Sequence, residues 1–275
     1  MPELPETETI ARGLDRAVSG ARITSVAVTH ADVLREVSPS TFKRRVAGAE
    51  IVRTVRRAKL VVMELSTGER IVVQPRFTGA LLIDAGDLPD REREYSTVAF
   101  ALADGRTLHY RDIRRLGTVM LMSRARWAEY EGGLGPEPLD HSFTPALLSG
   151  LLRGSRQAVK KLLMDQRRLA GIGNIYATEA LWRAAIDPSR AGETISADES
   201  RALHAAITGV LTESIAARGT SFRDYRDATG ERGEFASQLA AYGRAGEPCK
   251  RCGVHLATTD AIDGRATVFC AHCQR

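Results

Sequence analysis

The first residues of the chain carry two groups that could form and break bonds. The sequence begins Met1-Pro2-Glu3, and a methionine before a small second residue is normally removed, which would leave Pro2 with a free secondary amine. An α-amino group titrates at about 7.7–8.0, so part of it is neutral and nucleophilic at cellular pH. Its attack on an aldehyde-level carbon gives an iminium ion, which is a strong electron sink. Adjacent Glu3 could move a proton at the same centre, although an ordinary exposed terminus would look the same when taken alone.

The cysteines form a second reactive group. All four lie near the C-terminal end, as Cys249-Lys-Arg-Cys252 and Cys270-Ala-His-Cys273. Each pair can place two thiolates on one ion, and this spacing is typical of a structural zinc site. Four protein ligands leave no open position, so we expect one Zn²⁺ with a structural role. The alternative is two disulfides or unrelated thiols, and a cytosolic location disfavours disulfides.

Two further stretches could bind phosphate. Arg265 lies between the cysteine pairs in DGRATVFC, where a β-hairpin tip would present it, although a solvated turn arginine is the alternative. LAGIGNIYATEALW places Gly171, Gly173 and Asn174 directly before a helix, whose N-terminal amides bind anions. An ordinary interhelical turn capped by Asn174 is the other interpretation. Four basic residues lie nearby in the sequence: Lys160, Lys161, Arg167 and Arg168.

The N-terminal half predicts a β-rich domain that would position these groups. Glu6 to Val18 predicts a helix, with acidic residues in its first turn where the helix dipole favours them. From Ile23 to about Leu121, short β-rich runs alternate with turns: ITSVAV, AEIVRTV, LVVMEL, RIVVQP, ALLID, STVAFAL, TLHY and TVMLM. Many short strands at this spacing favour a β-sandwich or barrel.

The C-terminal half has a different pattern. Residues 131–145 contain GGLGPEPLD, which is typical of turns and marks the best domain boundary. From Pro145 to Arg218 the pattern is helical, in TPALLSGLL, RQAVKKLLMD, YATEALWRAA and ADESRALHAAITGVLTESIAA. Residues 219–240 are polar, contain glycine and lack apolar periodicity, so we interpret them as a loop.

Composition narrows the class of protein. The chain has 275 residues and 43% apolar residues, which favours two domains with proper cores. Lys and Arg number 39 against 34 Asp and Glu, giving a net charge of +5, which favours a polyanionic partner without proving one. No signal-peptide pattern and no run of about 18 apolar residues is present, so we expect a cytosolic protein that does not enter a membrane.

In combination, the motifs resemble the formamidopyrimidine-DNA glycosylase (MutM) family, which is related to endonuclease VIII. They run in order from residue 2 to residue 273: MPELPETE, RRAK at Arg56 to Lys59, IRRLG at Ile113 to Gly117, LGPEPL at Leu134 to Leu139, LMDQRRLAGIGNIYATEALW, and YGRAGEPCKRCG with the second CxxC pair. PELPE rather than PEGPE at the terminus is similar to the formamidopyrimidine branch.

The resemblance implies an α+β fold in four parts. Residues 1–130 would form a β-sandwich with an N-terminal helix, 131–145 a linker, 146–240 a helix–two-turns–helix domain and 241–275 a zinc finger. The partner would be double-stranded damaged DNA, held between the lobes of a monomer in the bacterial cytoplasm. The implied activity is that of a bifunctional DNA glycosylase/AP lyase of base excision repair. The base must leave the stack to be reached, and residues 219–240 match the loop that closes over it.

The resemblance also assigns roles to residues. Pro2 would attack C1′ of the damaged nucleotide, and Glu3 would donate the proton that opens the sugar. Lys59 matches a lysine that contacts phosphate and assists β-elimination, and Arg265 matches a phosphate clamp and the proton donor of δ-elimination. A further set is implied to contact or support DNA binding: Glu6, Phe77, Tyr95, Arg114, Leu116, Lys160, Gly173, Asn174 and Tyr242.

Several positions depart from the family pattern. The family's HLGMSG is here Gln74-Pro75-Arg76-Phe77-Thr78-Gly79, so Gln74 replaces a histidine and Phe77 a methionine that fills the gap left by the flipped base. In IRRLG, Leu116 replaces a phenylalanine that wedges the duplex, while Arg114 can still face the orphaned base. Tyr95 stands near the expected place of a DNA-contacting histidine. We therefore expect intact catalysis, while lesion choice and opposite-base preference are left open.

Two alternatives belong to other classes of protein. A non-catalytic damage binder would keep the scaffold, and loss of Pro2 or Glu3 would favour it, but both are present. A zinc-ribbon adaptor for nucleic acid or protein would not require the RRAK and GIGNIY segments.

Overall fold

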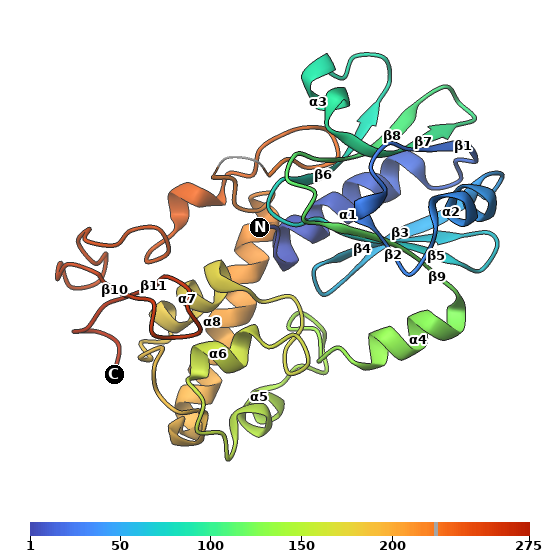
Figure 1. The fold of residues 1–275 in the computed structure, drawn as a ribbon. Coiled ribbons are helices and arrows are strands. Elements are labelled where there is room, and N and C mark those ends of the chain that lie inside the picture. The colour runs from blue at the N-terminus through green and yellow to red at the C-terminus, as the bar shows by residue number, and fades with distance from the viewer. Residues whose placement is uncertain (223–224) are drawn as a thin grey trace. The chain divides into compact units, whose positions relative to one another are not determined.

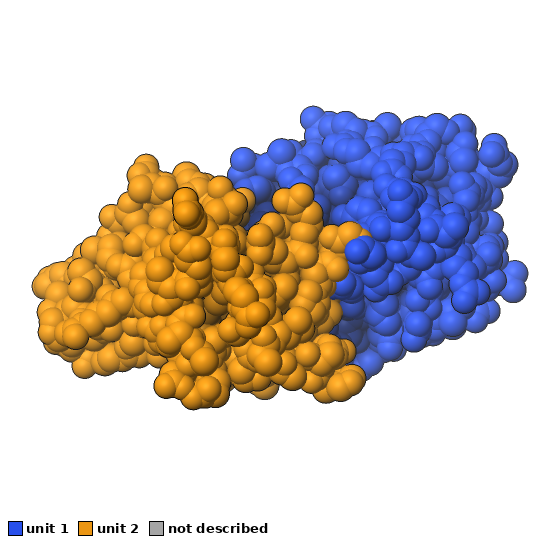
Figure 2. Space-filling view, turned by 90° about the horizontal axis from the view of Figure 1, so that it is seen from below, with its two compact units in different colours: residues 1–132, 217–234 blue, residues 133–216, 235–275 orange. Residues whose placement is uncertain are grey.

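The chain divides into two compact units. The computed structural model describes residues 1–222 and 225–275. Unit 1 comprises residues 1–132 and 217–234, and unit 2 comprises residues 133–216 and 235–275 (Figure 2). The segment 217–234 thus belongs to unit 1, although the chain on both sides of it belongs to unit 2. The expected loop over 219–240 is shared between the units, and its residues 223 and 224 lie outside the described residues.

Unit 1 is built on two sheets (Figure 1). The first has the order β1-β7-β8-β6 and consists of Ile23–Val28, Ser96–Leu102, Thr107–Asp112 and Gly79–Asp84. The second has the order β2-β9-β5-β4-β3 and consists of Leu34–Arg35, Thr118–Met122, Arg70–Gln74, Leu60–Leu65 and Ile51–Arg57. Neighbouring strands are antiparallel except β2 and β9. Each of the eight predicted β-rich runs contains one of these strands.

One apolar core joins both sheets to helix α1 (Leu4–Val18). Buried side chains of α1, of the first sheet and of the second sheet belong to a single cluster that includes Ile10, Leu14, Val26, Phe100, Met63, Val73 and Leu121. The predicted β-sandwich with an N-terminal helix is therefore confirmed. Helix α1 begins two residues before the predicted start, because Glu3 and Glu6 form a capping box across its first turn.

Four short helices of unit 1 were not predicted: η1 (Ala31–Val33), α2 (Pro39–Val46), α3 (Asp90–Glu94) and α4 (Arg124–Gly132). The reason is clearest for α2, which buries only Phe42 and Val46 and so shows no extended period. Its start was nevertheless marked, since Ser38 accepts a hydrogen bond from the Thr41 N–H and Pro39 occupies the first turn.

Unit 2 begins with helices and ends in a small hairpin. Its helical elements are α5 (Pro145–Leu152), α6 (Val159–Met164), α7 (Asn174–Arg183), η2 (Gly192–Thr194), α8 (Ala197–Ala216) and η3 (Phe235–Gln238). Helix α7 packs on α6 and α8, and α5 packs on α8. The hairpin of β10 (Ala257–Thr259) and β11 (Thr267–Phe269) carries the cysteines at its ends. Within the described residues, no helix combines the length and the apolarity needed to cross a bilayer.

Candidate active site and zinc site

The N-terminal end of helix α1 is closed and polar. Pro2 is buried, and Glu3 and Glu6 are 2% and 1% exposed. The Glu3 backbone N–H donates to a Glu6 carboxylate oxygen at 2.8 Å, and Thr7 donates its hydroxyl to the Glu3 carbonyl at 2.7 Å. Met1, in contrast, is 42% exposed. The residue that must be removed is thus accessible, while the two groups expected to act are held in place.

Glu6 also holds the segment 217–234 of unit 1. Its other carboxylate oxygen accepts a hydrogen bond from the Thr220 backbone N–H at 2.7 Å, and its carbonyl accepts one from the Tyr225 hydroxyl at 3.3 Å. A Cβ on Gly219 would come within 3.0 Å of the Glu6 side chain, so the backbone there requires glycine. Burial, together with the charge of Glu6, raises the pKa of Tyr225, which therefore remains a hydrogen-bond donor. Glu6 thus connects the N-terminal end of α1 to the segment 217–234, and its supporting role in DNA binding stays a prediction.

The register of α1 on β3 places Lys59 at the same end of the helix as Pro2. Asp15, late in α1, accepts a hydrogen bond from the Thr54 N–H at 2.7 Å. Glu8, early in α1, forms an ion pair with Arg56 at 2.7 Å. Strand β3 therefore runs from the C-terminal part of α1 toward its N-terminal end. The turn that follows Arg56 at that end contains Lys59. The Lys59 side chain is 7% exposed.

The electrostatics of this end are set by paired charges. Burial opposes ionisation of Glu8, but its hydrogen bonds and ion pairs with Arg56 and Arg12 outweigh burial and lower the pKa of the carboxyl. Arg56 also donates to the Ala58 carbonyl at 3.2 Å, which fixes the turn of the β3–β4 hairpin. Ala58 has a φ of 53°, an unusual conformation for a residue with a side chain. The hairpin tip is thus held by the same arginine that anchors it to α1.

Two neighbouring turns of unit 1 share a buried carboxylate. Asp112 accepts a hydrogen bond from the Thr78 hydroxyl at 2.5 Å on one oxygen and from the Gly117 N–H at 2.8 Å on the other. The Arg114 N–H in turn donates to the Thr78 hydroxyl at 3.0 Å. Burial, with the adjacent Asp112 charge, raises the pKa of Tyr110, whose hydroxyl donates to Asp112 at 3.3 Å. Asp112 and Thr78 were not predicted from the sequence, yet they connect the turns after β5 and β8.

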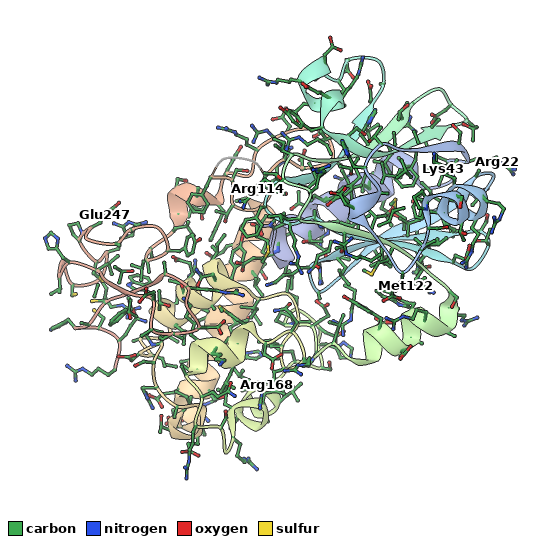
Figure 3. All side chains as sticks on the ribbon, in the orientation of Figure 1. Arg22, Lys43, Arg114, Met122, Arg168 and Glu247 are labelled. Atoms are coloured by element: carbon green, nitrogen blue, oxygen red, sulfur yellow. The ribbon has the colours of Figure 1, made fainter. Side chains whose placement is uncertain are left out.

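The tips of these two turns are exposed. Phe77 follows β5, and Arg114 and Leu116 follow β8 (Arg114 is labelled in Figure 3). Phe77 is 46% exposed and Leu116 is 40% exposed. Tyr95, at the end of α3, is also exposed, and its carbonyl accepts a hydrogen bond from the Asp112 N–H at 3.0 Å. The structure therefore brings these four predicted DNA contacts to connected segments of unit 1.

In unit 2, the glycine turn before α7 is organised by one amide. Gln166 donates to the Ile172 carbonyl at 2.8 Å and accepts from the Gly171 N–H at 2.9 Å. Gly171 has a φ of 84°, which favours glycine. Helix α7 then begins at Asn174 with Gly173 as its N-cap residue. The Asn174 side chain does not cap this helix.

Asn174 instead reaches the zinc-finger hairpin. Its amide donates to the Ala266 carbonyl at 3.0 Å, and the Lys160 ammonium donates to the Thr267 hydroxyl at 2.8 Å. Thr267 donates to the Arg265 carbonyl at 3.1 Å. The structure thus brings Asn174, Lys160 and Arg265 together from three separate segments. The Arg265 side chain is half-exposed, whereas Lys160 is fully buried, with its ammonium group inside unit 2.

Glu179 is a buried carboxylate that the sequence patterns did not single out. It lies on α7, is 1% exposed, and accepts hydrogen bonds from three successive backbone N–H groups, those of Ala240, Ala241 and Tyr242, at 2.7–2.9 Å. This carboxylate fixes the chain where Tyr242 is expected to contact the DNA backbone. A charged residue within the apolar pattern of YATEALW was the available signal, since buried carboxylates need partners.

The four cysteines form a site that fits one zinc ion. Their sulfur atoms all lie within 4.8 Å of one another. Tetrahedral zinc with bonds of about 2.3 Å places its sulfur ligands about 3.8 Å apart. The Cys252 and Cys270 sulfur atoms lie 3.5 Å apart, which is far longer than a disulfide bond. The Trp182 indole and the Arg251 N–H each donate to the Cys249 sulfur at 3.4 Å, which suits a thiolate.

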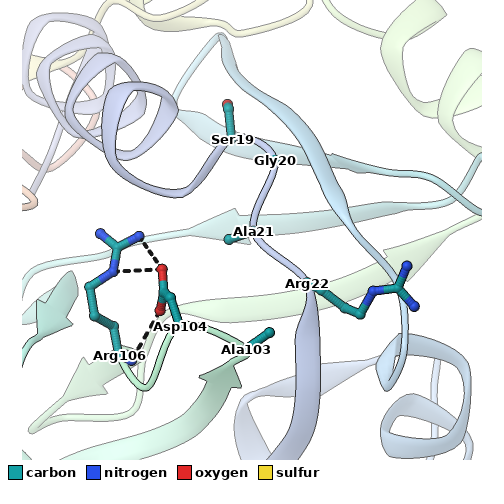
Figure 4. Close-up of a pocket in the computed structure, with 7 residues that line it drawn as sticks. All are labelled: Ser19, Gly20, Ala21, Arg22, Ala103, Asp104 and Arg106. Atoms are coloured by element: carbon teal, nitrogen blue, oxygen red, sulfur yellow. Dashed lines mark hydrogen bonds and ion pairs between the residues drawn. The ribbon is translucent and has the colours of Figure 1, made fainter.

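A separate hollow lies at the other end of α1. Ser19, Gly20 and Ala21 line it from the helix end, and Ala103, Asp104 and Arg106 from the β7–β8 turn (Figure 4). Arg106 pairs with Asp104 at 2.6 Å and donates to the Ala17 carbonyl at 2.8 Å. This hollow is at the C-terminal end of the helix, and Pro2 and Glu3 are at the N-terminal end. It is therefore no part of the candidate site.

Family models of known proteins match most of the chain. Family models match residues 1–119 (formamidopyrimidine-DNA glycosylase N-terminal domain), 134–226 (formamidopyrimidine-DNA glycosylase H2TH domain) and 246–275 (zinc finger found in FPG and IleRS). The zinc-finger match and the four-cysteine cluster together confirm one structural zinc.

Relatives and solved structures cover the chain end to end. Formamidopyrimidine-DNA glycosylase of Desulfitobacterium hafniense (strain DSM 10664 / DCB-2) is 40% identical over 276 residues, covering 100% of both chains. A Lactococcus lactis FPG mutant in complex with Fapy-dG-containing DNA is 32% identical, with a TM-score of 0.91 and 100% of each chain covered. The Lactococcus lactis Fpg in complex with abasic-site DNA is 31% identical, with a TM-score of 0.91 and 99% of each chain covered. The chain therefore belongs to the formamidopyrimidine-DNA glycosylase family, the DNA glycosylases of base excision repair.

Proposed function

We propose that this chain excises oxidised and ring-opened purines from double-stranded DNA and then cuts the resulting abasic site, with Pro2 as the nucleophile. The observation that carries the proposal is the common position of three groups at one end of α1. Pro2 and Glu3 are buried there, and the register of α1 on β3 brings the Lys59 turn to the same end. A nucleophile, a proton donor and a cation are what the reaction requires.

The first step breaks the bond between sugar and base. The neutral Pro2 nitrogen attacks C1′, the C1′–N bond to the base breaks, and the proton that the Pro2 nitrogen loses goes to the departing base. Glu3 in its acid form protonates O4′, the ring opens, and the nitrogen lone pair forms the C1′ iminium. The position of Glu3, buried and directly after Pro2 in the chain, supports this role.

The iminium then drives strand cleavage. Loss of a proton from C2′ breaks the bond from C3′ to the 3′ phosphate oxygen, which is β-elimination, and we assign Lys59 to that phosphate. Loss of the 5′ phosphate follows by δ-elimination, and we assign its proton donor to Arg265. Water finally hydrolyses the iminium and restores the free amine. Asn174 and Tyr242, held by the Ala266 carbonyl and by Glu179, are assigned to the DNA backbone.

The substrate and the state of the protein belong to the same proposal. The Lactococcus lactis relative is bound to Fapy-dG-containing DNA in one structure and to abasic-site DNA in another, so both are our expected substrates. We expect the protein to act as a monomer on chromosomal DNA in the bacterial cytoplasm. Sedimentation of the protein with and without a lesion duplex measures the first of these expectations.

The test is covalent trapping. With borohydride present during reaction with an abasic duplex, reduction of the iminium should join protein and DNA through the N-terminal nitrogen. Peptide mapping of the adduct should identify Pro2 as the modified residue. An N-terminal extension that blocks the amine should eliminate the adduct, and Pro2→Gly should keep some of it through its primary amine. Trapping that survives the block would make a lysine the nucleophile and would refute the proposal.

A further inference from the structure

The exposed side chains of Phe77 and Arg114 contact each other in unit 1. The Arg114 guanidinium carbon lies 5.1 Å from the centroid of the Phe77 ring, within cation–π range. Within residues 1–222 and 225–275, the Arg114 guanidinium has no hydrogen-bond or ion-pair partner. Its neighbours differ: Arg111 pairs with Glu92 at 2.8 Å, and Arg115 with Asp32 at 3.4 Å. The donors of Arg114 are thus left available to a ligand, while its plane rests on an aromatic ring.

The backbone holds the two residues in this relation. Thr78 follows Phe77 directly, and its hydroxyl accepts the Arg114 N–H at 3.0 Å. The same hydroxyl donates to the buried Asp112 carboxylate, so one side chain fixes both turns. A Cβ on Gly117 would lie 1.9 Å from the Tyr110 hydroxyl, so the second turn has no room for a side chain at this position. The Phe77–Arg114 contact is therefore built on a buried frame rather than on two loose side chains.

Phe77 also occupies a backbone conformation that is unfavourable for it. Its φ is 35°, in the left-handed region that is unfavourable for a bulky residue. Glycine or asparagine at this position would relieve the cost, and the side chain is 46% exposed, so burial does not repay it. The packing of unit 1 therefore does not account for a ring at this position.

We infer that Phe77 is a specificity-determining residue that acts through Arg114, by holding the guanidinium in one plane as the two turns enter the damaged duplex. The inference rests on the proposed function and on the DNA contacts that the sequence predicts for Phe77 and Arg114. When a damaged base leaves the stack, its partner base is unpaired, and its edge is read by donors in a fixed fork. A guanidinium stacked on Phe77 presents that fork in one orientation. Without the ring, the four side-chain torsions of Arg114 are less restricted, and bases with different edges are accepted more equally.

The experiment measures opposite-base discrimination in a double-mutant cycle. The probe is a duplex with a tetrahydrofuran abasic analogue opposite each of the four bases, and the readout is the ratio of the weakest to the tightest Kd at fixed salt. Phe77→Tyr keeps the ring and should keep the ratio. Phe77→Leu removes the ring but keeps an apolar side chain, and should shrink the ratio about three- to fivefold, as expected for one exposed cation–π contact. In an Arg114→Gln background, Phe77→Leu should change the ratio less than twofold.

The outcomes separate this inference from the proposed function. An unchanged ratio in Phe77→Leu, or an equal effect with and without Arg114, would overturn the inference. Equal losses in Phe77→Tyr and Phe77→Leu would also overturn it, because the ring would then not be the cause. Wild-type protein that neither traps abasic DNA with borohydride nor prefers the analogue to intact duplex would refute the proposed function instead. Thermal unfolding of each variant checks that the exposed substitution leaves unit 1 folded.

Discussion

The Glu6 carboxylate accepts the backbone N–H of Thr220 at 2.7 Å, across 214 positions of the chain. Its other oxygen accepts the Glu3 N–H at 2.8 Å. One buried side chain thus connects the N-terminal end of α1 to the segment 217–234, and each of its two carboxylate oxygens accepts one of these hydrogen bonds. The position of the nucleophile and the position of this segment cannot vary independently within unit 1.

Replacement of Glu6 by glutamine should break this connection. An amide offers one acceptor where two N–H donors are present, so one donor would face an NH₂ group, at a cost of about 1.5–3 kcal/mol. We expect Glu6→Gln to raise the rate of proteolysis within residues 217–234 about tenfold and to lower the rate of lesion excision. The matched control is Glu231→Gln, because Glu231 is exposed in the same segment. Equal proteolysis of the two variants would contradict the role of Glu6.

Removal of one zinc ligand should affect unit 2 first. In Cys252→Ser, metal analysis should find well under one zinc per chain, because three thiolates bind zinc more weakly than four. Hydrogen exchange should increase around β10, β11 and Asn174, and DNA affinity should fall, while the sheets of unit 1 keep their protection. His272→Ala changes an exposed neighbour of the ligands and should retain one zinc. Normal DNA affinity in a metal-free protein would refute a structural zinc.

The salt dependence of DNA affinity should report the number of phosphate contacts. Each contact contributes about −0.9 to the slope of log K against log salt concentration. Arg265→Ala should therefore make the slope less steep by about 0.9, and Asn174→Ala, which removes no charge, should weaken binding at every salt concentration by a similar factor. Arg44→Ala removes the same charge from an exposed position on α2 and should leave the slope unchanged. If Arg265→Ala and Arg44→Ala give the same slope, Arg265 does not contact phosphate.

An ion pair at the start of α8 predicts how stability depends on pH. The hydrogen bond from Arg190, opposed by burial and aided by the Ser196 N–H, lowers the pKa of Glu199 to about 2 from 4.5. A lowered carboxyl pKa stabilises the folded state above pH 4.5, and this contribution is lost as the pH falls toward about 2. Glu199→Gln should therefore lower the free energy of unfolding at pH 7 by up to about 1 kcal/mol, because the pair is partly exposed, and by nothing near pH 2.

The control for this prediction is Glu193→Gln. Glu193 lies 3.9 Å from Arg156, which is 92% exposed, so its loss should have no measurable effect at either pH. The measurement is the difference in unfolding free energy between each variant and the wild type at each pH. A constant difference for Glu199→Gln from pH 7 to pH 2 would show that the ion pair does not carry the effect.

The sequence predicted local features better than connections between distant segments. Alternating apolar residues located the strands of unit 1, and the CxxC spacing located the zinc ligands, because both patterns are contained in a few neighbouring residues. Short helices such as α2 were not predicted, because two buried residues are too few to show a helical period. The resemblance named Glu6 as a support, but no periodicity could reveal that its partner is Thr220.

The same contrast between local features and connections of distant segments holds for the candidate site. Residue type and motif singled out Pro2, Glu3, Lys59 and Arg265, and the register of α1 on β3 then placed Lys59 at the N-terminal end of the helix. Asp112 and Thr78 went unnoticed, because nothing around them in the sequence shows that they are buried. Glu179 was missed although its place in the apolar pattern of YATEALW was a signal. Their hydrogen bonds orient the turns and the backbone from which the exposed groups project.

The place of residues 217–234 in unit 1 has a consequence for how the protein is made. A ribosome releases residues 1–132 early, and the two sheets can then pair around α1, but the Thr220 N–H has not yet been synthesised. Domains generally fold as units during synthesis, in order from the N-terminus. Here the first unit waits for helices α5 to α8 to emerge before its last segment arrives. The N-terminal end of α1, which holds the first residues translated, is therefore among the last parts of the molecule to be completed.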